Sequence, residues 1–286
     1  MPSPFDPPIT AVREIVTRAL AEDLEPLGDL TASLVPAGAM VRADIRSRGT
    51  GVLAGTACAD EVCRQVDPSI IVTWHRRDGE PLTPGTVAGE LSGPLASVLT
   101  AERSALNFLC HLSGVASATA RFVAAVRTAN PSVRLWDTRK TLPGLRALEK
   151  AAVRAGGAVN HRGNLSDFIL VKDNHLAGFT ITEAVQRAKD RWPGRTVEVE
   201  CDRIEQVREA VAAGATMVML DNMTPEQVAE CVRLVDHRVL VEVSGGITLD
   251  NIGGYASAGP DLISTSAITQ SAPAFDLGLD LHVELV

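Results

Sequence analysis

The sequence lacks the features of a disulfide-bonded, secreted or membrane-spanning protein. Its five cysteines are odd in number and none forms a CxxC pair, which predicts reduced, mostly buried thiols rather than disulfides or a thiolate metal site. The N-terminus MPSPFDPPIT has no basic-then-apolar signal pattern. No apolar run approaches the roughly 18 residues that a membrane span needs. We therefore expect a cytoplasmic protein with no membrane partner.

Positive charge is also scarce over the chain as a whole. The 286 residues carry a formal net charge of −8 and a pI of about 5.3, so the broad basic face that binds nucleic acid is not expected. The exception is residues 134–172, where eight Lys/Arg stand against three Asp/Glu. A basic segment in an acidic chain indicates a focused anion site.

Within this segment, two basic pairs differ from the other cations. Residues 139–140 and 161–162 lie beside turns that contain glycine, where a side chain or backbone can approach a bound anion closely. Arg146, Lys150 and Arg154 instead recur at i, i+4 and i+8, which is typical of one solvated helix face.

The first part of the chain predicts a small, mostly antiparallel sheet with helices. Apolar spacing indicates a helix over 9–24, and short apolar or alternating runs, with a helix over 59–66, make up residues 25–95. Residues 97–129 form one long helical region, which we interpret as a bridge between two domains, with an interruption expected at Gly114.

From residue 133 onward, short apolar strands alternate with helical stretches. Six strands are predicted, with starts 35, 28, 21, 22 and 23 residues apart, which is the spacing of βαβ units with a parallel sheet. A polar residue ends each strand: Asp137, Lys172, Glu200, Asp221, Ser244 and Ser264. In a βα barrel these strand ends surround one mouth. A flat, doubly wound sheet is the alternative, but we favour the barrel, complete or not.

The residues at this mouth predict two kinds of anion contact. The cations are Arg139, Lys140, Arg162 and Lys172, with His161 beside them, and arginine suits carboxylates whereas lysine serves phosphate as a point charge. Glu200 and Asp221 on neighbouring strands suit Mg²⁺ together with substrate phosphates. Ser244, Gly245 and Gly246, and the second loop at Ser264 and Ser266, are small residues that we expect to precede helices and to bind phosphate there.

These residues alone indicate a substrate with carboxylates and another with phosphates. They leave open group transfer on a phosphorylated sugar and an aldolase-like reaction. A Schiff-base role for Lys172 also stays open, because neighbouring cations can depress the pKa of a lysine.

Seven segments resemble the quinolinate phosphoribosyltransferase family, also called the decarboxylating nicotinate-nucleotide pyrophosphorylases. They are TAERSALNFLCHLSG (100–114), DTRKTLPGLRALEKAAVRAGGAVNHR (137–162), ILVKDNH (169–175), VEVE (197–200), MLDN (219–222), VSGGI (243–247) and GDLT (28–31). The resemblance covers most of the chain in order.

This resemblance implies an α/β fold with an N-terminal α/β sandwich over 1–115, joined by the tail 275–286, and an incomplete α/β barrel over 116–274. It implies transfer of phosphoribosyl from phosphoribosyl pyrophosphate to quinolinate, with loss of pyrophosphate and CO₂, giving nicotinate mononucleotide. It also implies a homodimer or a dimer-based hexamer whose active sites are shared between subunits.

The implied site residues fall into two groups. Quinolinate would be bound by Arg139, His161, Arg162 and Lys172, with Arg103 from the partner subunit. Phosphoribosyl pyrophosphate would be bound by Lys140, Glu200, Asp221, Ser244, Gly245, Gly246, Ser264 and Ser266, and Glu200 and Asp221 would hold Mg²⁺. Lys140, Glu200 and Asp221 would be the catalytic residues.

The chain departs from the family pattern in its last phosphate loop. Ser266 stands where the family usually has glycine, and Gln270 replaces a common histidine. A serine at 266 would be costly if the loop needs a positive φ there. Two rival hypotheses remain at this stage: a related transferase for another acid, such as nicotinate or the substrate of a molybdenum-associated paralogue, and a non-catalytic sensor of phosphorylated metabolites.

Overall fold

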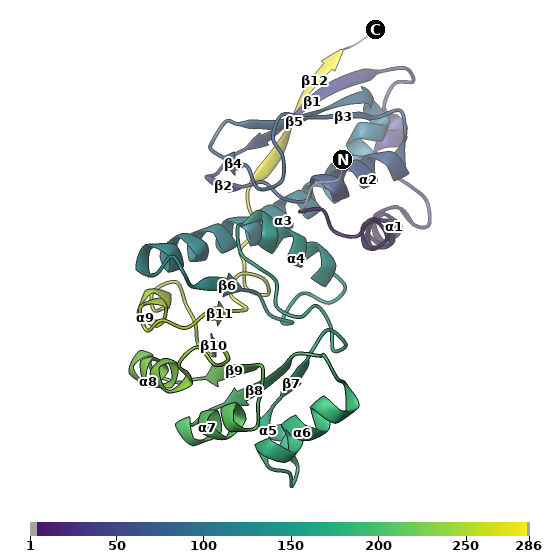
Figure 1. Cartoon of the computed structure of the whole chain (residues 1–286). Helices are drawn as coiled ribbons and strands as arrows, with labels where there is room; N and C mark the ends of the chain where they lie inside the picture. Colours follow the sequence, from purple (N-terminus) through teal and green to yellow (C-terminus); the bar gives the residue numbers. More distant parts are fainter. Residues whose placement is uncertain (1–4, 285–286) are drawn as a thin grey trace. The chain divides into compact units, whose positions relative to one another are not determined.

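The computed structural model describes residues 5–284 and divides the chain into two compact units (Figure 1). Unit 1 comprises Met1–Ala120, Thr141–Gly157 and Ser271–Val286, and unit 2 comprises Arg121–Lys140 and Ala158–Gln270. The expected domain ranges 1–115 and 275–286 extend, at residues 1–4 and 285–286, beyond the described part of the chain.

Unit 1 is built on a four-stranded antiparallel sheet in the order β12-β1-β5-β3. These strands span Leu277–Glu284, Met40–Ser47, Val87–Pro94 and Ile71–Trp74. The strand from the tail, β12, pairs along the whole of β1, from Ser47 opposite Leu277 to Met40 opposite Glu284. The remaining elements of the unit are α1 (Ile9–Leu24), a 3-10 turn (Ala32–Leu34), β2 (Gly51–Val52), α2 (Thr56–Val66), β4 (Pro81–Leu82) and α4 (Arg146–Ala155).

Buried carboxylates in unit 1 accept hydrogen bonds. Asp78 accepts the backbone N–H groups of Gly55 and Thr56, at 2.9 and 3.2 Å, and so caps the N-terminus of α2. Glu149 is fully buried, and its Oε1 lies 2.9 Å from His111 Nε2. These contacts satisfy the carboxylate of Asp78 and one of the two carboxylate oxygens of Glu149.

The long helix α3 (Leu95–Ala129) is continuous, so the interruption expected at Gly114 was wrong. Gly114 is needed for packing instead, because a Cβ at this position would lie 2.1 Å from the carbonyl oxygen of Pro273. By length and composition alone α3 could cross a membrane, but most of its apolar window is buried inside the protein.

The helix α4 corrects a second expectation. The solvated face predicted for Arg146, Lys150 and Arg154 is absent, since Lys150 is buried and the other two are half-buried. Arg154 donates to the carbonyl oxygens of Phe5, Asp6 and Lys150. Helical spacing identified the common face correctly, but that face packs against protein.

Unit 2 contains the predicted parallel strands: β6 (Arg134–Trp136), β7 (Ile169–Val171), β8 (Val197–Cys201), β9 (Met217–Asp221), β10 (Leu240–Ser244) and β11 (Leu262–Ser264). Their order in the sheet is β6-β11-β10-β9-β8-β7. The order never reverses, and the first strand pairs with the last. This is the topology of a barrel left open between its first two strands, and a doubly wound sheet would contain a reversal.

The helices of unit 2 follow one another along the outside of this sheet (Figure 1). They are α5 (Asp173–Leu176), α6 (Ile181–Arg191), α7 (Ile204–Ala212), α8 (Pro225–Val235) and α9 (Ile252–Ser257). Thr180 and Thr224 cap α6 and α8, each accepting a backbone N–H three residues on. Because the helices cover the outer face of the sheet, the side chains on its inner face are available to form the site.

Candidate active site

Inward-facing residues of the barrel strands form two layers, because side chains two residues apart on a strand face the same side. The upper layer lies at the carboxyl ends of the strands and contains Lys172, Glu200, Asp221, Ser244 and Ser264. The lower layer contains Leu170, Glu198, Met219 and Glu242. All of the upper layer and most of the lower layer line one cavity of about 360 Å³.

This cavity brings together ten of the thirteen residues predicted for the site. They are Arg139, Lys140, His161, Arg162, Lys172, Glu200, Asp221, Ser244, Gly245 and Ser264. Arg103 lies on α3 in unit 1, where its side chain is exposed. Gly246 and Ser266 are outside the lining of the cavity.

Asp137, the polar residue at the end of β6, supports the cationic side of the cavity without lining it. Its carboxylate is fully buried and accepts the backbone N–H of His161 at 2.7 Å and the side-chain amide of Asn160 at 2.8 Å. Because these contacts fix the segment that carries His161 and Arg162, Asp137 determines where two predicted ligands of the substrate lie.

Two guanidinium groups, those of Arg139 and Arg162, line this side of the cavity. Arg162 is buried, and burial followed by the charge of Arg139 lowers the pKa of its guanidinium. Arg162 also donates to the carbonyl oxygen of Phe168 at 3.2 Å and stacks over the ring of that residue. A bound anion would relieve the repulsion between the two arginines.

The acidic side of the cavity lies on β8 and β9. Burial, and then the charge of Glu200, raise the pKa of Asp221, while Lys172, Lys140 and the amide of Asn222 act in the opposite direction. Lys172 forms an ion pair with Glu200. Asn222 has a positive φ of 56° and donates to Asp221 at 2.7 Å, so a sterically restricted turn orients this carboxylate.

The ion pair between Lys172 and Glu200 bears on the Schiff-base alternative. A lysine that forms imines must be available as a neutral amine. In this structure the Nζ of Lys172 is engaged by the carboxylate of Glu200 instead. The geometry therefore favours Lys172 as a cationic ligand.

The two predicted phosphate loops differ from expectation in one respect. Ser244–Gly246 is separated from α9 by residues 247–251, and Ser264–Ser266 is followed by turns rather than a helix. Gly245 and Gly246 do have positive φ values of 92° and 61°, and a Cβ at Gly245 would lie 2.3 Å from Asn222 Oδ1. The first loop therefore requires glycine, although no helix N-terminus directly follows it.

The second loop does not show the strain anticipated at Ser266. Among the described residues, the non-glycine positions in the left-handed region of φ are Asn222, Asp236 and His237, so serine is compatible with the backbone at 266. The following turn is tied to the site, because Thr269 Oγ1 donates to the carbonyl oxygen of Lys140 at 2.8 Å.

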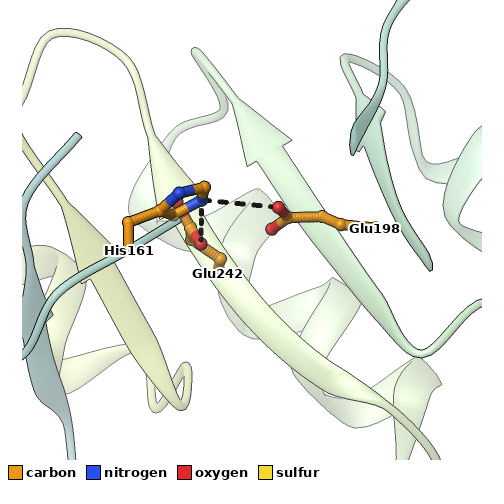
Figure 2. Close-up of side chains that lie close together, drawn as sticks. All are labelled: His161, Glu198 and Glu242. Atoms are coloured by element: carbon orange, nitrogen blue, oxygen red, sulfur yellow. Dashed lines mark ion pairs between the residues drawn. The ribbon is translucent and has the colours of Figure 1, made fainter. Parts of the chain in front are cut away.

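Sequence reasoning missed Glu198 and Glu242, which are both fully buried beneath the cavity. Each lies within 3.4 Å of His161 Nε2 through one carboxylate oxygen (Figure 2). A signal was present, since both strands contain a Val-Glu-Val run that places a charged residue at an inward position. Period-two alternation identifies such positions, but it does not reveal their partner on another segment.

Two groups of side chains offer donor atoms of the kinds that bind metal ions. Glu200 and Asp221 offer carboxylate oxygens at the mouth, as Mg²⁺ prefers. The ligand atoms of His161, Glu198 and Glu242 lie within 4.8 Å of one another. However, His161 Nδ1 accepts the backbone N–H of Arg162 at 2.8 Å, so Nε2 carries the hydrogen and has no lone pair to offer an ion.

The charge of His161 follows from the same neighbours. Burial acts to lower the pKa of the imidazole, but Glu198 and Glu242 outweigh it and raise the pKa to about 9. The contact at Nδ1 fits the neutral ring, whereas the two carboxylates favour the charged one. In either state Nε2 carries a hydrogen, and one oxygen of each glutamate lies 3.4 Å from this nitrogen.

Comparison with known families and proteins gives a consistent result. Residues 29–113 match the N-terminal domain, and residues 115–280 the C-terminal domain, of quinolinate phosphoribosyl transferase. The nicotinate-nucleotide pyrophosphorylase (carboxylating) of Mycobacterium leprae is 40% identical over 278 residues, which cover 95% of this chain and 97% of that protein. The human protein of the same name is 38% identical, with 98% and 94% covered.

A solved structure agrees with the sequence matches. The nicotinate-nucleotide pyrophosphorylase from Francisella tularensis superposes with a TM-score of 0.92 at 38% identity, covering 97% of this chain and 98% of that one. The similarity therefore extends over both units rather than over the barrel alone.

Proposed function

The chain belongs to the quinolinate phosphoribosyltransferase family and carries out that family's reaction in NAD biosynthesis, and we propose that the cavity at the carboxyl ends of β6–β11 is where it does so. The reaction joins quinolinate to phosphoribosyl pyrophosphate and yields nicotinate mononucleotide, pyrophosphate and CO₂. The assignments of individual residues below are part of this proposal.

Quinolinate binds on the cationic side of the cavity. Arg139 and Arg162 bind its two carboxylates, and His161 and Lys172 contact the same ring substituents. The observation that carries this assignment is that both guanidinium groups line one cavity and that the charge of Arg139 lowers the pKa of Arg162. Their mutual repulsion is offset when a dianion lies between them. A monocarboxylate would make only one of these two carboxylate contacts.

Phosphoribosyl pyrophosphate binds on the acidic side and along the two loops. Glu200 and Asp221 contact its ribose, Lys140 contacts the pyrophosphate, and the loop residues Ser244, Gly245, Gly246, Ser264 and Ser266 take the 5′-phosphate. The side chain of Ser264 supports this role, because its buried Oγ has no hydrogen-bond partner within residues 5–284.

The acidic pair also fits Mg²⁺, which takes one or two protein carboxylates together with substrate phosphates. When bound, the ion neutralises charge on the departing pyrophosphate. Glu200 and Asp221 are the residues that would hold it, directly or through water.

Transfer then proceeds by displacement at the sugar. The bond between C1 of ribose and the pyrophosphate oxygen breaks, and its electron pair leaves with pyrophosphate, beside Lys140. Glu200 and Asp221 stabilise the positive charge that develops on the sugar. The lone pair of the quinolinate nitrogen, held opposite by the bound carboxylates, forms the new bond to C1.

Loss of CO₂ follows from the pyridinium that this bond creates. The bond from ring carbon 2 to its carboxylate breaks, and the electron pair remains on the carbon next to the positive nitrogen. A proton from water then replaces the carboxylate. Cations that bind the second carboxylate keep the ring in place, so no covalent intermediate with the protein is needed.

We also propose that Arg103 completes the quinolinate pocket of a partner subunit, in a homodimer or a dimer-based hexamer. The exposure of this arginine on α3 supports the assignment, because its charge is available to a second copy of the chain. We place the enzyme in the cytoplasm, in line with its unpaired cysteines.

The test is an assay of the purified protein with quinolinate, phosphoribosyl pyrophosphate and Mg²⁺, with nicotinate in parallel. We expect nicotinate mononucleotide and CO₂ from quinolinate, and little product from nicotinate. Equal turnover of the two acids would contradict the dicarboxylate pocket, and binding of both substrates without turnover would indicate a sensor.

A further inference from the structure

Two glutamates form the floor beneath the proposed quinolinate pocket. Glu198 lies two residues before Glu200 on β8, and Glu242 lies two residues before Ser244 on β10. Each glutamate therefore faces the barrel interior one layer below a residue of the mouth. Figure 2 shows the two side chains converging on His161 from separate strands.

The position of these carboxylates is unfavourable for folding alone. Both are fully buried, and none of their four oxygens has a hydrogen-bond partner within residues 5–284. Burial, and then the charge of Glu242, raise the pKa of Glu198, which shows that a second negative charge is costly here. Well-packed apolar residues at such positions are commonly as stable or more stable. A contribution to function would explain why charged residues occupy this layer.

The imidazole above them has little freedom to turn. The backbone N–H of Arg162 donates to Nδ1, and the backbone N–H of His161 donates to Asp137. The rings of Trp136 and Phe168 lie at centroid distances of 5.1 and 5.0 Å. With Nδ1 occupied, Nε2 carries the hydrogen, and one carboxylate oxygen of each glutamate lies 3.4 Å from this nitrogen.

The same carboxylates act on a second cation of the pocket: Arg162 follows His161 directly in the chain and lines the same cavity as Glu242. The charges of Glu198 and Glu242 both raise the pKa of Arg162, in opposition to burial and Arg139. They therefore provide counter-charge to His161 and Arg162 before any substrate is bound.

We propose that Glu198 and Glu242 are positioning residues for quinolinate: they hold the imidazole of His161 through its Nε2–H, and the guanidinium of Arg162 through its charge, in the arrangement that receives the substrate. This inference rests on the proposed function. The glutamates act through these two cations and not through phosphoribosyl pyrophosphate, whose predicted ligands lie in the upper layer and the loops.

The experiment compares Glu198→Leu and Glu242→Leu with Glu198→Gln and Glu242→Gln. Leucine removes both the acceptor and the charge, whereas glutamine keeps one acceptor and the shape. We expect the KM for quinolinate to rise about tenfold in the leucine variants and less in the glutamine variants. The KM for phosphoribosyl pyrophosphate should stay within about twofold, and Tm should not fall.

A double-variant cycle separates positioning from packing. In a His161→Ala background, each glutamate substitution should raise the KM for quinolinate much less than it does alone, because the group being held is gone. Glu205→Leu, at an exposed glutamate of α7, is the matched control and should leave both KM values unchanged.

Several outcomes would overturn the inference while leaving the reaction intact. An unchanged or lower KM for quinolinate would mean that the glutamates do not position the pocket or merely repel the dianion. A lower Tm with both KM values raised equally would mean that they only pack the core. Absence of quinolinate turnover by the unmodified protein would instead overturn the proposed function, and this inference with it.

Discussion

Buried carboxylates in unit 1 accept hydrogen bonds, while Glu198 and Glu242 beneath the cavity of unit 2 lie 3.4 Å from the Nε2 nitrogen of His161 without a hydrogen bond from residues 5–284. Asp78 accepts two backbone N–H groups, and Glu61 accepts hydrogen bonds from the guanidinium of Arg64. Glu198 and Glu242 have none from any residue in the described part of the chain. Asp78 and Glu61 therefore satisfy donors of unit 1 itself, whereas Glu198 and Glu242 of unit 2 lie where a substrate is expected.

This difference predicts opposite effects of substitution in the two units. Removing a buried acid from unit 1 should lower stability and spare the activity of the folded protein. Removing a charged residue from the cavity of unit 2 should lower activity and spare stability.

The largest effect is expected for Lys140→Ala in unit 2. We propose that this exposed lysine neutralises the departing pyrophosphate, and the loss of one such stabiliser commonly lowers kcat about 10²- to 10³-fold. The measurement is the steady-state rate of nicotinate mononucleotide formation, with Tm recorded in parallel. Lys189→Ala, on the exposed side of α6, is the control, and a wild-type rate for Lys140→Ala would remove Lys140 from the mechanism.

The next effect is expected for Asp78→Ala in unit 1. The substitution leaves the N–H groups of Gly55 and Thr56 without their acceptor at the start of α2, which should lower the free energy of unfolding by about 2 kcal/mol. Urea denaturation followed by circular dichroism measures the change, with the exposed Asp250→Ala as control. A reduced kcat in the folded variant, at unchanged stability, would contradict the division between the units.

Arg103→Ala tests the limit of this division between the units, because Arg103 belongs to unit 1 but is assigned a role in substrate binding. We expect the KM for quinolinate to rise about tenfold with little change in Tm, since one charge-assisted contact is lost. Mixing this variant with Arg139→Ala should restore part of the activity if one active site takes residues from two copies. Failure of every mixture to regain activity would argue against a shared site.

The smallest effect concerns acid stability in unit 1. Hydrogen bonds from Arg64, against a smaller effect of burial, lower the pKa of Glu61 from 4.5 to about 2. A carboxyl whose pKa is lower in the folded protein stabilises it above its ordinary pKa, and this contribution disappears as the pH falls from about 4.5 towards 2. Glu61→Gln should therefore flatten the fall of Tm in that range, and an unchanged profile would show that the contact adds nothing.

Local patterns predicted much of the architecture. The apolar period placed α1 at residues 9–24, with the bounds that the structure has. The alternation of strands and helices predicted the parallel sheet and the polar residues at its carboxyl edge. These features depend on periodicity and turn chemistry, which a single segment carries by itself.

The misses depended on contacts between distant segments. Gly114 was expected to break a helix because glycine is a poor helix former, but it lies where the chain near Pro273 comes too close for a side chain. Lys150 has surface spacing and is buried. Glu198 and Glu242 lie near His161, which is 37 and 81 residues away in sequence. A pattern within one segment cannot predict a partner on a distant segment.

The pairing of β12 with β1 has a consequence for the order in which the protein can fold during synthesis. All six strands of the barrel lie between residues 134 and 264, so every partner in that sheet has been translated before residue 277. The sheet of unit 1 must instead wait for Leu277–Glu284, although its other strands were made first. Until then, β1 presents an open edge on the nascent chain, where a chaperone could bind or a wrong strand could pair.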